Sequence, residues 1–364
     1  MSSTDIIKKI KNISKWYVYA KRKGPYYPYP LHVFNRGFCE GWKKNFKECY
    51  LRLHVNVFYG NGWVEVYYLQ EDIDKLQKVV LAKILHPKEH FAREMLSEYT
   101  RYARVLRQIT RQLQQVNLSK PKLCFNVLRK LHQIYIDSTT SGAVTPWGGI
   151  CLTNLLREYL SKKIPQSLVP KYFSILSAPT KPSFVFQENG SLLKIAYKFQ
   201  QGIDIKKDLK QHTQKFAWIP FDYNGPQIYT ESYFIAQIQQ ILKQGNIKIK
   251  IQHQQNYLKN LKKQQHRLLK KLKIDVSYRR LFKDMQTFIW QKDFKKEIYT
   301  KVHLAIWQFL QKLSKERRVK VQNLVYLTSQ EIEKFVLTNI ATKVLKDGDL
   351  VEVDADMGIV RILT

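Results

Sequence analysis

Between residues 91 and 116, apolar residues recur at steps of three and four, which is the spacing of one face of an α-helix. These residues are Phe91, Met95, Tyr99, Tyr102, Leu106, Ile109, Leu113 and Val116. The intervening arginines fall on other faces of the same helix: Arg101, Arg104, Arg107 and Arg111. A helical pattern also starts at Asp72 and is broken by Pro87. Long amphipathic helices are therefore the expected framework.

Further helices are predicted along most of the chain. Residues 122–136 and 150–160 are predicted as two helices, separated by a turn at residues 145–149, because this Thr-Pro-Trp-Gly-Gly segment carries proline and glycine. Helical spacing downstream predicts helices over residues 234–242, 254–272, 278–312 and 329–335. The predicted fold class is mainly α, with a helical bundle-like body.

Two small β-hairpins complete the expected fold. Residues 51–57 and 64–68 alternate apolar and polar side chains around a turn at residues 59–62, which contains Gly60 and Gly62. At the end of the sequence, residues 350–353 and 359–363 are predicted as strands, with turns at residues 346–349 and 356–358. An isolated pair of strands leaves backbone groups unpaired at both edges, so we expect this second hairpin to be poorly supported.

Four parts are predicted along the chain. Residues 1–164 form an N-terminal aromatic and basic region with the first hairpin and helices, and residues 165–190 form a Pro-rich connection. Residues 191–336 form a second helical region, and residues 337–364 carry the second hairpin. In the first 48 residues, prolines favour extended backbone over helix. These prolines are Pro25, Pro28 and Pro30.

The charge balance is strongly basic. The chain has 62 Lys and Arg against 29 Asp and Glu, a formal net charge of +33, and such an excess attracts nucleic acid, an anionic membrane surface or an acidic protein. AT-rich codon usage also raises Lys, but it predicts abundant Glu as well, and Glu is scarce here while Gln is plentiful. The charge is therefore interpreted in part as functional.

One predicted helix concentrates this charge. Residues 243–273 hold ten Lys or Arg and no Asp or Glu. The candidate polyanion surface comprises Lys259, Lys262, Lys263, Arg267, Lys270 and Lys271. With the arginines of residues 101–111, it could bind phosphates, and nearby tyrosines could stack on bases. These are Tyr99, Tyr102 and Tyr257. The alternative is a solvated helix face, since no nucleic-acid-binding motif accompanies the charge.

The cysteines and the N-terminus give expectations about compartment. Cys39, Cys49, Cys124 and Cys151 form no C-x-x-C pair, so neither zinc nor a disulfide framework is expected, and free thiols in a reducing compartment fit best. The first residues lack the apolar segment of a signal peptide, and no uncharged apolar run approaches the roughly 18 residues of a membrane span. The expectation is a cytoplasmic protein with no membrane partner.

Three segments carry a resemblance to a known family. The first is His212-Thr213-Gln214-Lys215-Phe216-Ala217-Trp218-Ile219-Pro220-Phe221-Asp222-Tyr223-Asn224-Gly225 with residues 229–234. The second runs over residues 281–313 and 323–332, and the third over residues 340–354 and 358–360. Together they resemble phosphoenolpyruvate synthase and pyruvate phosphate dikinase, in the helical region before the mobile phosphohistidine domain. Residues 337–364 are similar to the closing hairpin of that domain.

The resemblance implies phosphotransfer chemistry that this chain lacks the groups to perform. Family members carry the phosphoryl group on a histidine in a Gly-Gly-x-x-Ser-His pattern, whereas the only Gly-Gly here, Gly148-Gly149, has no histidine nearby. The resemblance therefore predicts a degenerate, truncated or accessory member, with no catalytic residue, metal site or cofactor of its own, although intact relatives use ATP and Mg. Separately encoded phosphotransferase domains are its expected partners.

Two alternatives remain open at this point. One is a basic helical nucleic-acid-binding protein. The other is an active phosphotransferase whose sequence is incomplete here between Phe335 and Ile340. The motif positions have no assigned role: His212, Lys215, Trp218, Tyr223, Gly225, Gly348, Asp349, Asp354 and Gly358.

Several of these residues also have a plain structural interpretation. His212 is expected to pack or cap a helix, with ligand contact as the alternative. The segment around Trp218 and Asp222 is expected to form a capped turn, with the positioning of an adjacent domain as the alternative. The aspartates near the end lack EF-hand spacing and are expected to stabilise turns rather than hold calcium. They are Asp347, Asp349, Asp354 and Asp356.

Overall fold

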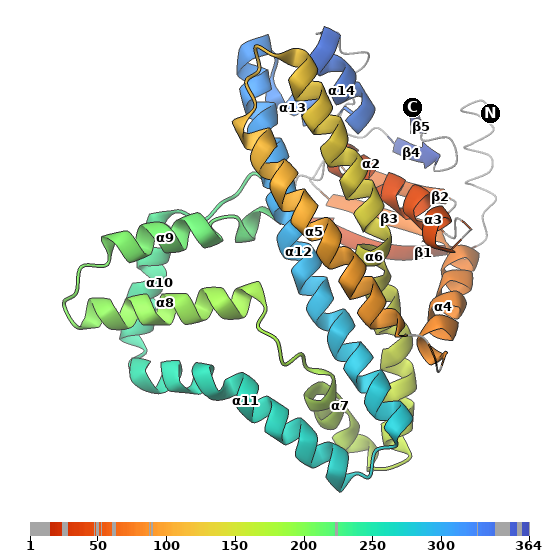
Figure 1. Cartoon of the computed structure of the whole chain (residues 1–364), viewed down its shortest axis with the longest axis vertical. Helices are drawn as coiled ribbons and strands as arrows, with labels where there is room; N and C mark the ends of the chain where they lie inside the picture. The colour runs from red at the N-terminus through yellow and green to blue at the C-terminus, as the bar shows by residue number, and fades with distance from the viewer. Residues whose placement is uncertain are drawn as a thin grey trace.

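The computed structural model describes residues 15–23, 28–46, 48, 51, 53–59, 63–86, 88, 90–222, 225–325, 327–338, 350–354 and 359–363. Its elements form a tall helical body with a small sheet on one side and a helical lobe projecting from the other (Figure 1). The mainly α fold with an N-terminal hairpin is confirmed.

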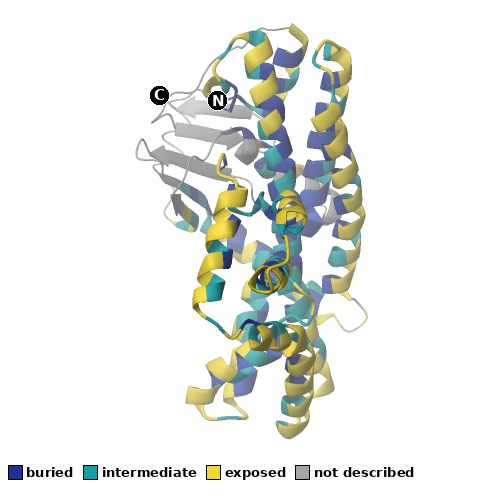
Figure 2. Ribbon diagram, turned by 90° about the vertical axis from the view of Figure 1, so that its left-hand side faces the viewer, coloured by how far each residue is buried: buried dark blue, intermediate teal, exposed yellow. Residues whose placement is uncertain are grey.

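Three long helices form the body, and each contacts the other two. They are α5 (Phe91–Gln115), α6 (Pro121–Ser161) and α12 (Val276–Arg317). The predicted apolar face of α5 is confirmed, since Tyr99, Leu106, Ile109 and Leu113 are buried. Buried residues concentrate along these helices, whereas much of the surrounding surface is exposed (Figure 2).

The helix α6 runs without interruption through Pro146, so the prediction of two helices separated by a turn is wrong. Its middle, residues 138–145, is buried throughout. Neighbouring elements enclose this segment, and the absence of a side chain at Gly148 lets the Phe288 ring of α12 approach closely. A Cβ there would lie 2.6 Å from Cε2 of Phe288. Tertiary packing has overridden the local preference of proline and glycine for a turn.

Buried hydroxyls in the middle of α6 donate hydrogen bonds to backbone carbonyls of the same helix. Ser138 and Thr139 donate to the Tyr135 carbonyl at 2.7 and 2.9 Å, and Thr145 donates to the Gly142 carbonyl at 3.0 Å. Such local bonds satisfy polar groups that burial would otherwise leave without water. The polar run can therefore lie at the centre of the body.

A five-stranded antiparallel sheet flanks the body in the order β1-β3-β2-β4-β5. The strands are β1 (Trp16–Lys23), β2 (Leu53–Tyr59), β3 (Trp63–Leu69), β4 (Leu350–Asp354) and β5 (Ile359–Leu363). Both predicted hairpins are present as paired strands, but β1 was not predicted. The turns predicted at residues 346–349 and 356–358 lie outside the described residues.

The expectation that the second hairpin has two unpaired edges is wrong, because β4 pairs with β2. Leu53 faces Asp354, and Asn56 faces Val351 in this antiparallel ladder. The strands of the two hairpins therefore share one sheet and satisfy each other's backbone groups. Helix α4 (Gln70–Leu85) follows β3 directly.

The backbone of residues 28–46 is helical, which corrects the expectation of extended structure there. Helix α2 (Pro28–Arg36) leads into a π-helical turn, η1 (Gly37–Gly41), and then into α3 (Trp42–Phe46). Pro28 and Pro30 lie in the first turn of α2, where the backbone N–H has no helical partner and proline is tolerated. Pro25 lies outside the described residues.

The lobe, defined here as residues 184–246, holds α8 (Phe184–Gln200), α9 (Lys206–Phe216), the 3₁₀ turn η3 (Ile219–Phe221) and α10 (Glu231–Lys243). It has its own small core, and η3 and α8 contact α12. The core comprises Leu192, Ile195, Ala196, Leu209, Phe216, Phe234 and Ile238, packed with Ile247.

Helices before and after the lobe connect it to the body. Residues 165–190 contain η2 (Gln166–Leu168) and α7 (Val169–Ser177) before α8 begins. After the lobe, α11 (Ile247–Lys271) returns to the body, and the Gln265 side chain donates to the carbonyls of Ile175 and Ala178, both at 2.8 Å. Helices α13 (Val321–Val325) and α14 (Ser329–Thr338) follow α12. The helices predicted in this half are confirmed.

Candidate anion-binding cleft

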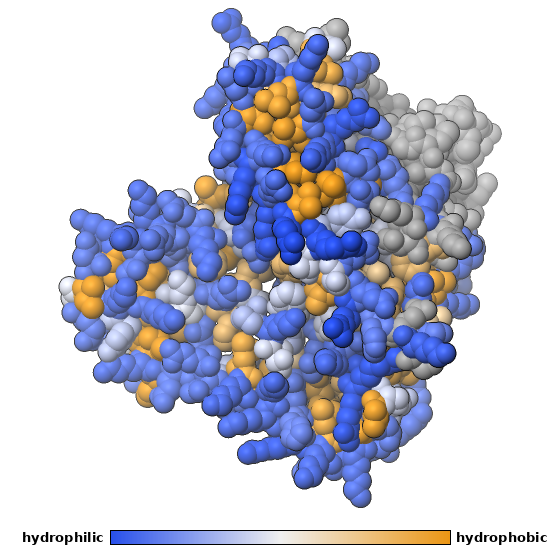
Figure 3. All heavy atoms as spheres, viewed as in Figure 1, coloured by the Kyte–Doolittle hydropathy of each residue, from blue (hydrophilic) through white to orange (hydrophobic). Residues whose placement is uncertain are grey.

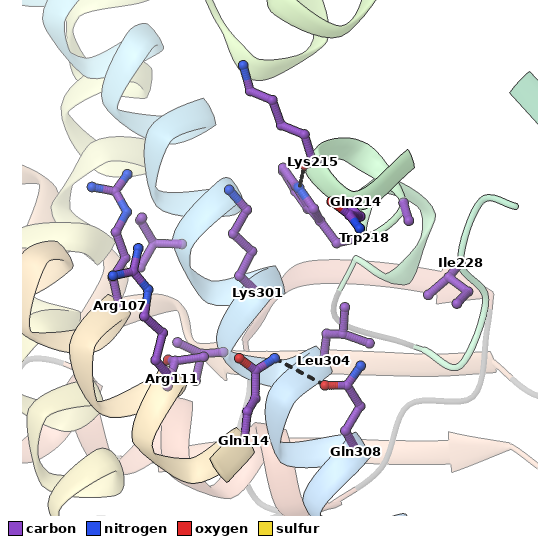
Figure 4. Close-up of a pocket in the computed structure, with 14 residues that line it drawn as sticks. Arg107, Arg111, Gln114, Gln214, Lys215, Trp218, Ile228, Lys301, Leu304 and Gln308 are labelled. Carbon is purple, nitrogen blue, oxygen red and sulfur yellow. Dashed lines mark hydrogen bonds between the residues drawn. The ribbon is translucent and has the colours of Figure 1, made fainter. Parts of the chain in front are cut away.

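A cleft of about 500 Å³ lies where the lobe meets α5 and α12 (Figure 4). Three separate parts of the chain line it. From α5 come Arg107, Thr110, Arg111 and Gln114; from α12 come Ile298, Lys301, Val302, Leu304 and Gln308; from the lobe come Gln214, Lys215, Ala217, Trp218 and Ile228. The lobe therefore forms one wall and the two long helices form the other.

The charged groups of the cleft are all cationic: Arg107, Arg111, Lys215 and Lys301. None of the described lining residues is a carboxylate. Because like charges brought together repel one another, such a site is most stable with an anion present. On the face drawn in Figure 3, hydrophilic residues predominate and surround separate apolar patches.

Exposed arginines extend the positive charge of the cleft along α5. Arg101, Arg104, Arg107 and Arg111 are all exposed and lie within one face of the helix, given its 3.6-residue period. We call this set the arginine stripe. It spans about 15 Å along the helix axis, so it can meet more than one negative group of an extended ligand.

Trp218 joins the lobe to the body at the cleft. Its ring is buried, with 4% exposed, and its Nε1–H donates to the Lys215 carbonyl at 2.7 Å. The Lys301 ammonium lies 4.8 Å from the ring centroid, within the range of a cation–π contact. Nearby, Lys296 Nζ of α12 lies 3.2 Å from Asp222 Oδ2. Contacts on both sides of η3 thus hold the lobe wall of the cleft against α12.

Two glutamines bridge the helices beside these cations. Gln114 Nε2 donates to Gln308 Oε1 at 3.2 Å, tying α5 to α12. Lys312 of α12 donates to the Gln114 carbonyl at 2.8 Å. The amides add neutral donors and acceptors to the lining.

One carboxylate lies close to the cleft without lining it. Glu297 Oε1 is 2.6 Å from Lys301 Nζ and 4.0 Å from Arg107 Nη2. Both cations keep substantial exposure, with 37% and 46% of their side chains accessible. Water therefore screens these pairs, and the local charge stays positive.

Among the motif positions, Lys215 and Trp218 line the cleft, whereas His212 is buried inside the lobe. His212 Nδ1 lies 2.9 Å from Ser191 Oγ, and Nε2 lies 3.3 Å from Glu188 Oε1. The sequence did not reveal Glu188 as a partner of His212, since it lies in the preceding helix, α8. Gly225 is buried against Phe221, with a positive φ of 46°.

The remaining motif positions do not join this site in the described part of the chain. Asp354 lies in β4, of which only the backbone is described. Outside the described residues lie Tyr223, Asp347, Gly348, Asp349, Asp356 and Gly358.

The candidate polyanion surface on α11 is exposed but lies apart from the cleft lining. Its Tyr257 is 43% exposed. Tyr99 is fully buried, so the prediction that it could stack on bases is wrong. Its ring packs edge-on against Tyr299, with centroids 5.8 Å apart, because it belongs to the apolar face of α5.

The sequence did not identify Lys301 and Gln308 as residues of the site, because no local pattern marks them.

Comparison with protein-family models, curated proteins and solved structures found no match to this chain. The cleft must therefore be interpreted from its own chemistry. Among the described residues, no group of three or more His, Cys, Asp or Glu is placed to hold a metal ion.

Two further properties bear on the class of protein. In the part of the chain that the structure describes, no helix has the length and apolar character needed to cross a bilayer. Cys124 and Cys151 are free thiols, and burial raises the pKa of Cys151 to about 11, so this thiol is protonated at neutral pH.

Proposed function

We propose that this protein binds nucleic acid, with phosphates held in the cleft between the lobe and the helical body. The supporting observation is a cleft lined by four cationic residues from three parts of the chain, in a protein of net charge +33. No described carboxylate lines that cleft.

Phosphate chemistry suits these groups. Guanidinium groups bind phosphate oxygens through paired N–H donors, and ammonium groups act as point charges. The arginine stripe leads into the cleft, so successive phosphates of one strand can be neutralised along α5. Gln114 and Gln308 offer amide groups for the sugars. Release of condensed counterions then supplies much of the binding free energy.

The test measures the affinity of the full chain for a labelled oligonucleotide between about 50 and 300 mM salt. Over this range, counterion release makes affinity depend strongly on salt. Engagement of all four cleft cations predicts a log–log slope of about −3 or steeper with a single strand. Arg111→Gln should reduce the magnitude of this slope by about 0.7. Lys75→Gln, an exposed lysine of α4 on the flank away from the lobe, should leave it unchanged (Figure 1).

Two results would count against the proposal. Binding that is absent, or that does not vary with salt, removes the electrostatic basis of the function. Equal losses in Arg111→Gln and Lys75→Gln would mean that the charge acts diffusely rather than through the cleft.

We also propose, on the sequence segments, a relationship to the phosphoenolpyruvate-utilising enzymes as a non-catalytic or accessory member. The segment that carries part of this resemblance, residues 212–225, supplies Lys215 and Trp218 to the cleft wall. Incubation with labelled ATP or phosphoenolpyruvate should leave the protein unphosphorylated. A stoichiometric, acid-labile phosphohistidine would contradict this second proposal.

A further inference from the structure

A pair of stacked tyrosines lies beside the cleft on the lobe wall. The rings of Tyr229 and Tyr233 are 3.8 Å apart between centroids and 5° from parallel. Tyr229 directly follows Ile228, which lines the cleft, and its backbone N–H donates at 2.9 Å to the carbonyl of Ala217, another lining residue. The tyrosine pair is thus attached to the wall that carries Trp218.

The start of α10 holds this pair in place. Thr230 is the N-cap of α10, and its hydroxyl accepts a hydrogen bond from the Tyr233 backbone N–H at 3.3 Å. Buried Phe234 supports both rings, with centroids 5.5 Å from Tyr229 and 5.3 Å from Tyr233. Although its neighbours are packed, Tyr233 remains 36% exposed. A rigid aromatic surface on the lobe wall of the cleft is therefore already formed.

The size of the cleft bears on the form of nucleic acid that fits. Its volume, about 500 Å³, is in the range of pockets that enclose a small molecule. Its walls meet where Lys301 contacts Trp218, and Gln114 bonds to Gln308. A duplex is a wide, stiff cylinder that meets a protein on its outside, whereas one phosphate with its nucleoside can enter such a cleft.

Base stacking also favours a single strand over a duplex. Bases in a duplex are paired and covered by their neighbours, so an external tyrosine cannot stack on them. Unpaired bases expose their faces and stack on aromatic side chains with little regard to sequence. A single strand can use both features, with phosphates on the cations of the cleft and an unpaired base on the exposed tyrosine of the adjoining lobe wall.

We infer that the ligand of the cleft is single-stranded nucleic acid, with phosphates on Arg107, Arg111 and Lys301 and a neighbouring base stacked on Tyr233. This inference rests on the proposed function and narrows its ligand. We therefore expect single strands of different base sequence to bind with similar affinity, since neither stacking nor phosphate contact reads base identity.

The experiment compares the full chain and three variants on three labelled ligands of equal length: a single strand, the same sequence as a duplex, and an abasic single strand. The variants are Tyr233→Leu, Tyr233→Phe and Tyr257→Leu. Tyr257 is the matched control, because it is an exposed tyrosine on basic helix α11, which contributes no residue to the cleft, whereas Tyr233 stacks on the neighbour of Ile228 in the cleft lining. Circular dichroism confirms that each variant is folded.

The wild-type protein should bind the single strand roughly 5- to 100-fold more tightly than the duplex at 0.15 M salt, since the duplex offers no base to stack on Tyr233. Tyr233→Leu should weaken single-strand binding by roughly 5- to 100-fold without changing the salt slope. Tyr233→Phe should restore binding, because the aromatic ring is kept. On the abasic strand, Tyr233→Leu should bind like the wild type, and Tyr257→Leu should match the wild type throughout.

Several outcomes would overturn the inference. Duplex binding as tight as single-strand binding would refute it while leaving nucleic-acid binding intact. Loss of binding in Tyr257→Leu but not in Tyr233→Leu would move the aromatic contact to α11. Displacement of the strand by equimolar inorganic phosphate or mononucleotide would assign the cleft to a small phosphate ligand. Failure of every strand to bind would refute the proposed function as well.

Discussion

The ammonium of Lys301 lies 4.8 Å from the centroid of the Trp218 ring, so a residue of α12 and a residue of the lobe meet in the lining of the cleft. The same ammonium is 2.6 Å from Glu297. Lys301 is therefore held between a ring and a carboxylate before any ligand arrives. Such preorganisation reduces the loss of side-chain conformational entropy when a ligand binds.

Replacement of Lys301 should affect binding more than stability. Lys301→Gln removes one phosphate-binding cation and should lower the magnitude of the salt slope by about 0.7 to 0.9. Its contacts are partly exposed, so their loss should cost no more than about 1 kcal/mol of unfolding free energy. Anisotropy titrations and urea denaturation measure the two quantities. A large loss of stability with an unchanged salt slope would make Lys301 a structural contact.

Removal of the neighbouring carboxylate should have the opposite effect on binding. Glu297→Gln deletes the negative charge beside Lys301 and Arg107 while keeping the shape of the side chain. Both cations then face the ligand without competition, and we expect several-fold tighter binding at low salt. Glu158→Gln on α6 is the control, because Glu158 forms a similar exposed pair with Lys162. Unchanged or weaker binding in Glu297→Gln would contradict this prediction.

Alanine substitutions at the adjacent glycines of α6, Gly148 and Gly149, should have opposite effects on stability. At Gly148, a new Cβ would meet the buried Phe288 ring at 2.6 Å, so Gly148→Ala should destabilise the protein by about 1–3 kcal/mol through overpacking. At Gly149, a Cβ meets nothing within 4 Å. Gly149→Ala should stabilise the protein by up to about 1 kcal/mol, because alanine is the better helix former. Thermal denaturation of both variants tests whether α6 is continuous, since a turn at this point would not favour alanine at Gly149.

Buried histidines should make stability fall as the solution becomes acidic. Burial lowers the pKa of His303 from 6.5 to about 4, and burial also lowers the pKa of His132. Between pH 6.5 and 4 the unfolded chain binds protons that the folded chain does not, so unfolding becomes easier as pH falls. The His303 contribution is up to about 3 kcal/mol.

This pH dependence can be assigned to His303 with one variant. His303→Gln keeps a polar group that can reach the Tyr135 hydroxyl, which lies 3.1 Å from Nε2, but it cannot titrate. Chemical denaturation across the pH range should show a shallower loss of stability below pH 6.5 in the variant, even if its stability at pH 7 is lower. Parallel curves for the two proteins would mean that His303 titrates normally in the folded state.

The sequence by itself determined the local elements of this protein. Apolar spacing over residues 91–116 predicted α5 with its buried face, and alternation predicted the strands that became β2 and β3. The same period kept the arginines of this helix off its apolar face. These features depend on residues a few positions apart, whose relative directions are set by backbone geometry alone.

Only the tertiary structure decided how these elements meet. The pairing of β2 with β4 and the meeting of Lys301 with Trp218 each join parts of the chain that are distant in sequence. The passage of α6 through Pro146 depends on packing against such distant parts, for example Phe288 against Gly148. Local spacing carries no information about which distant partner will be present. Proline can remain within a helix when surrounding packing outweighs its local cost, and four scattered cations become one site only when the lobe folds against α5 and α12.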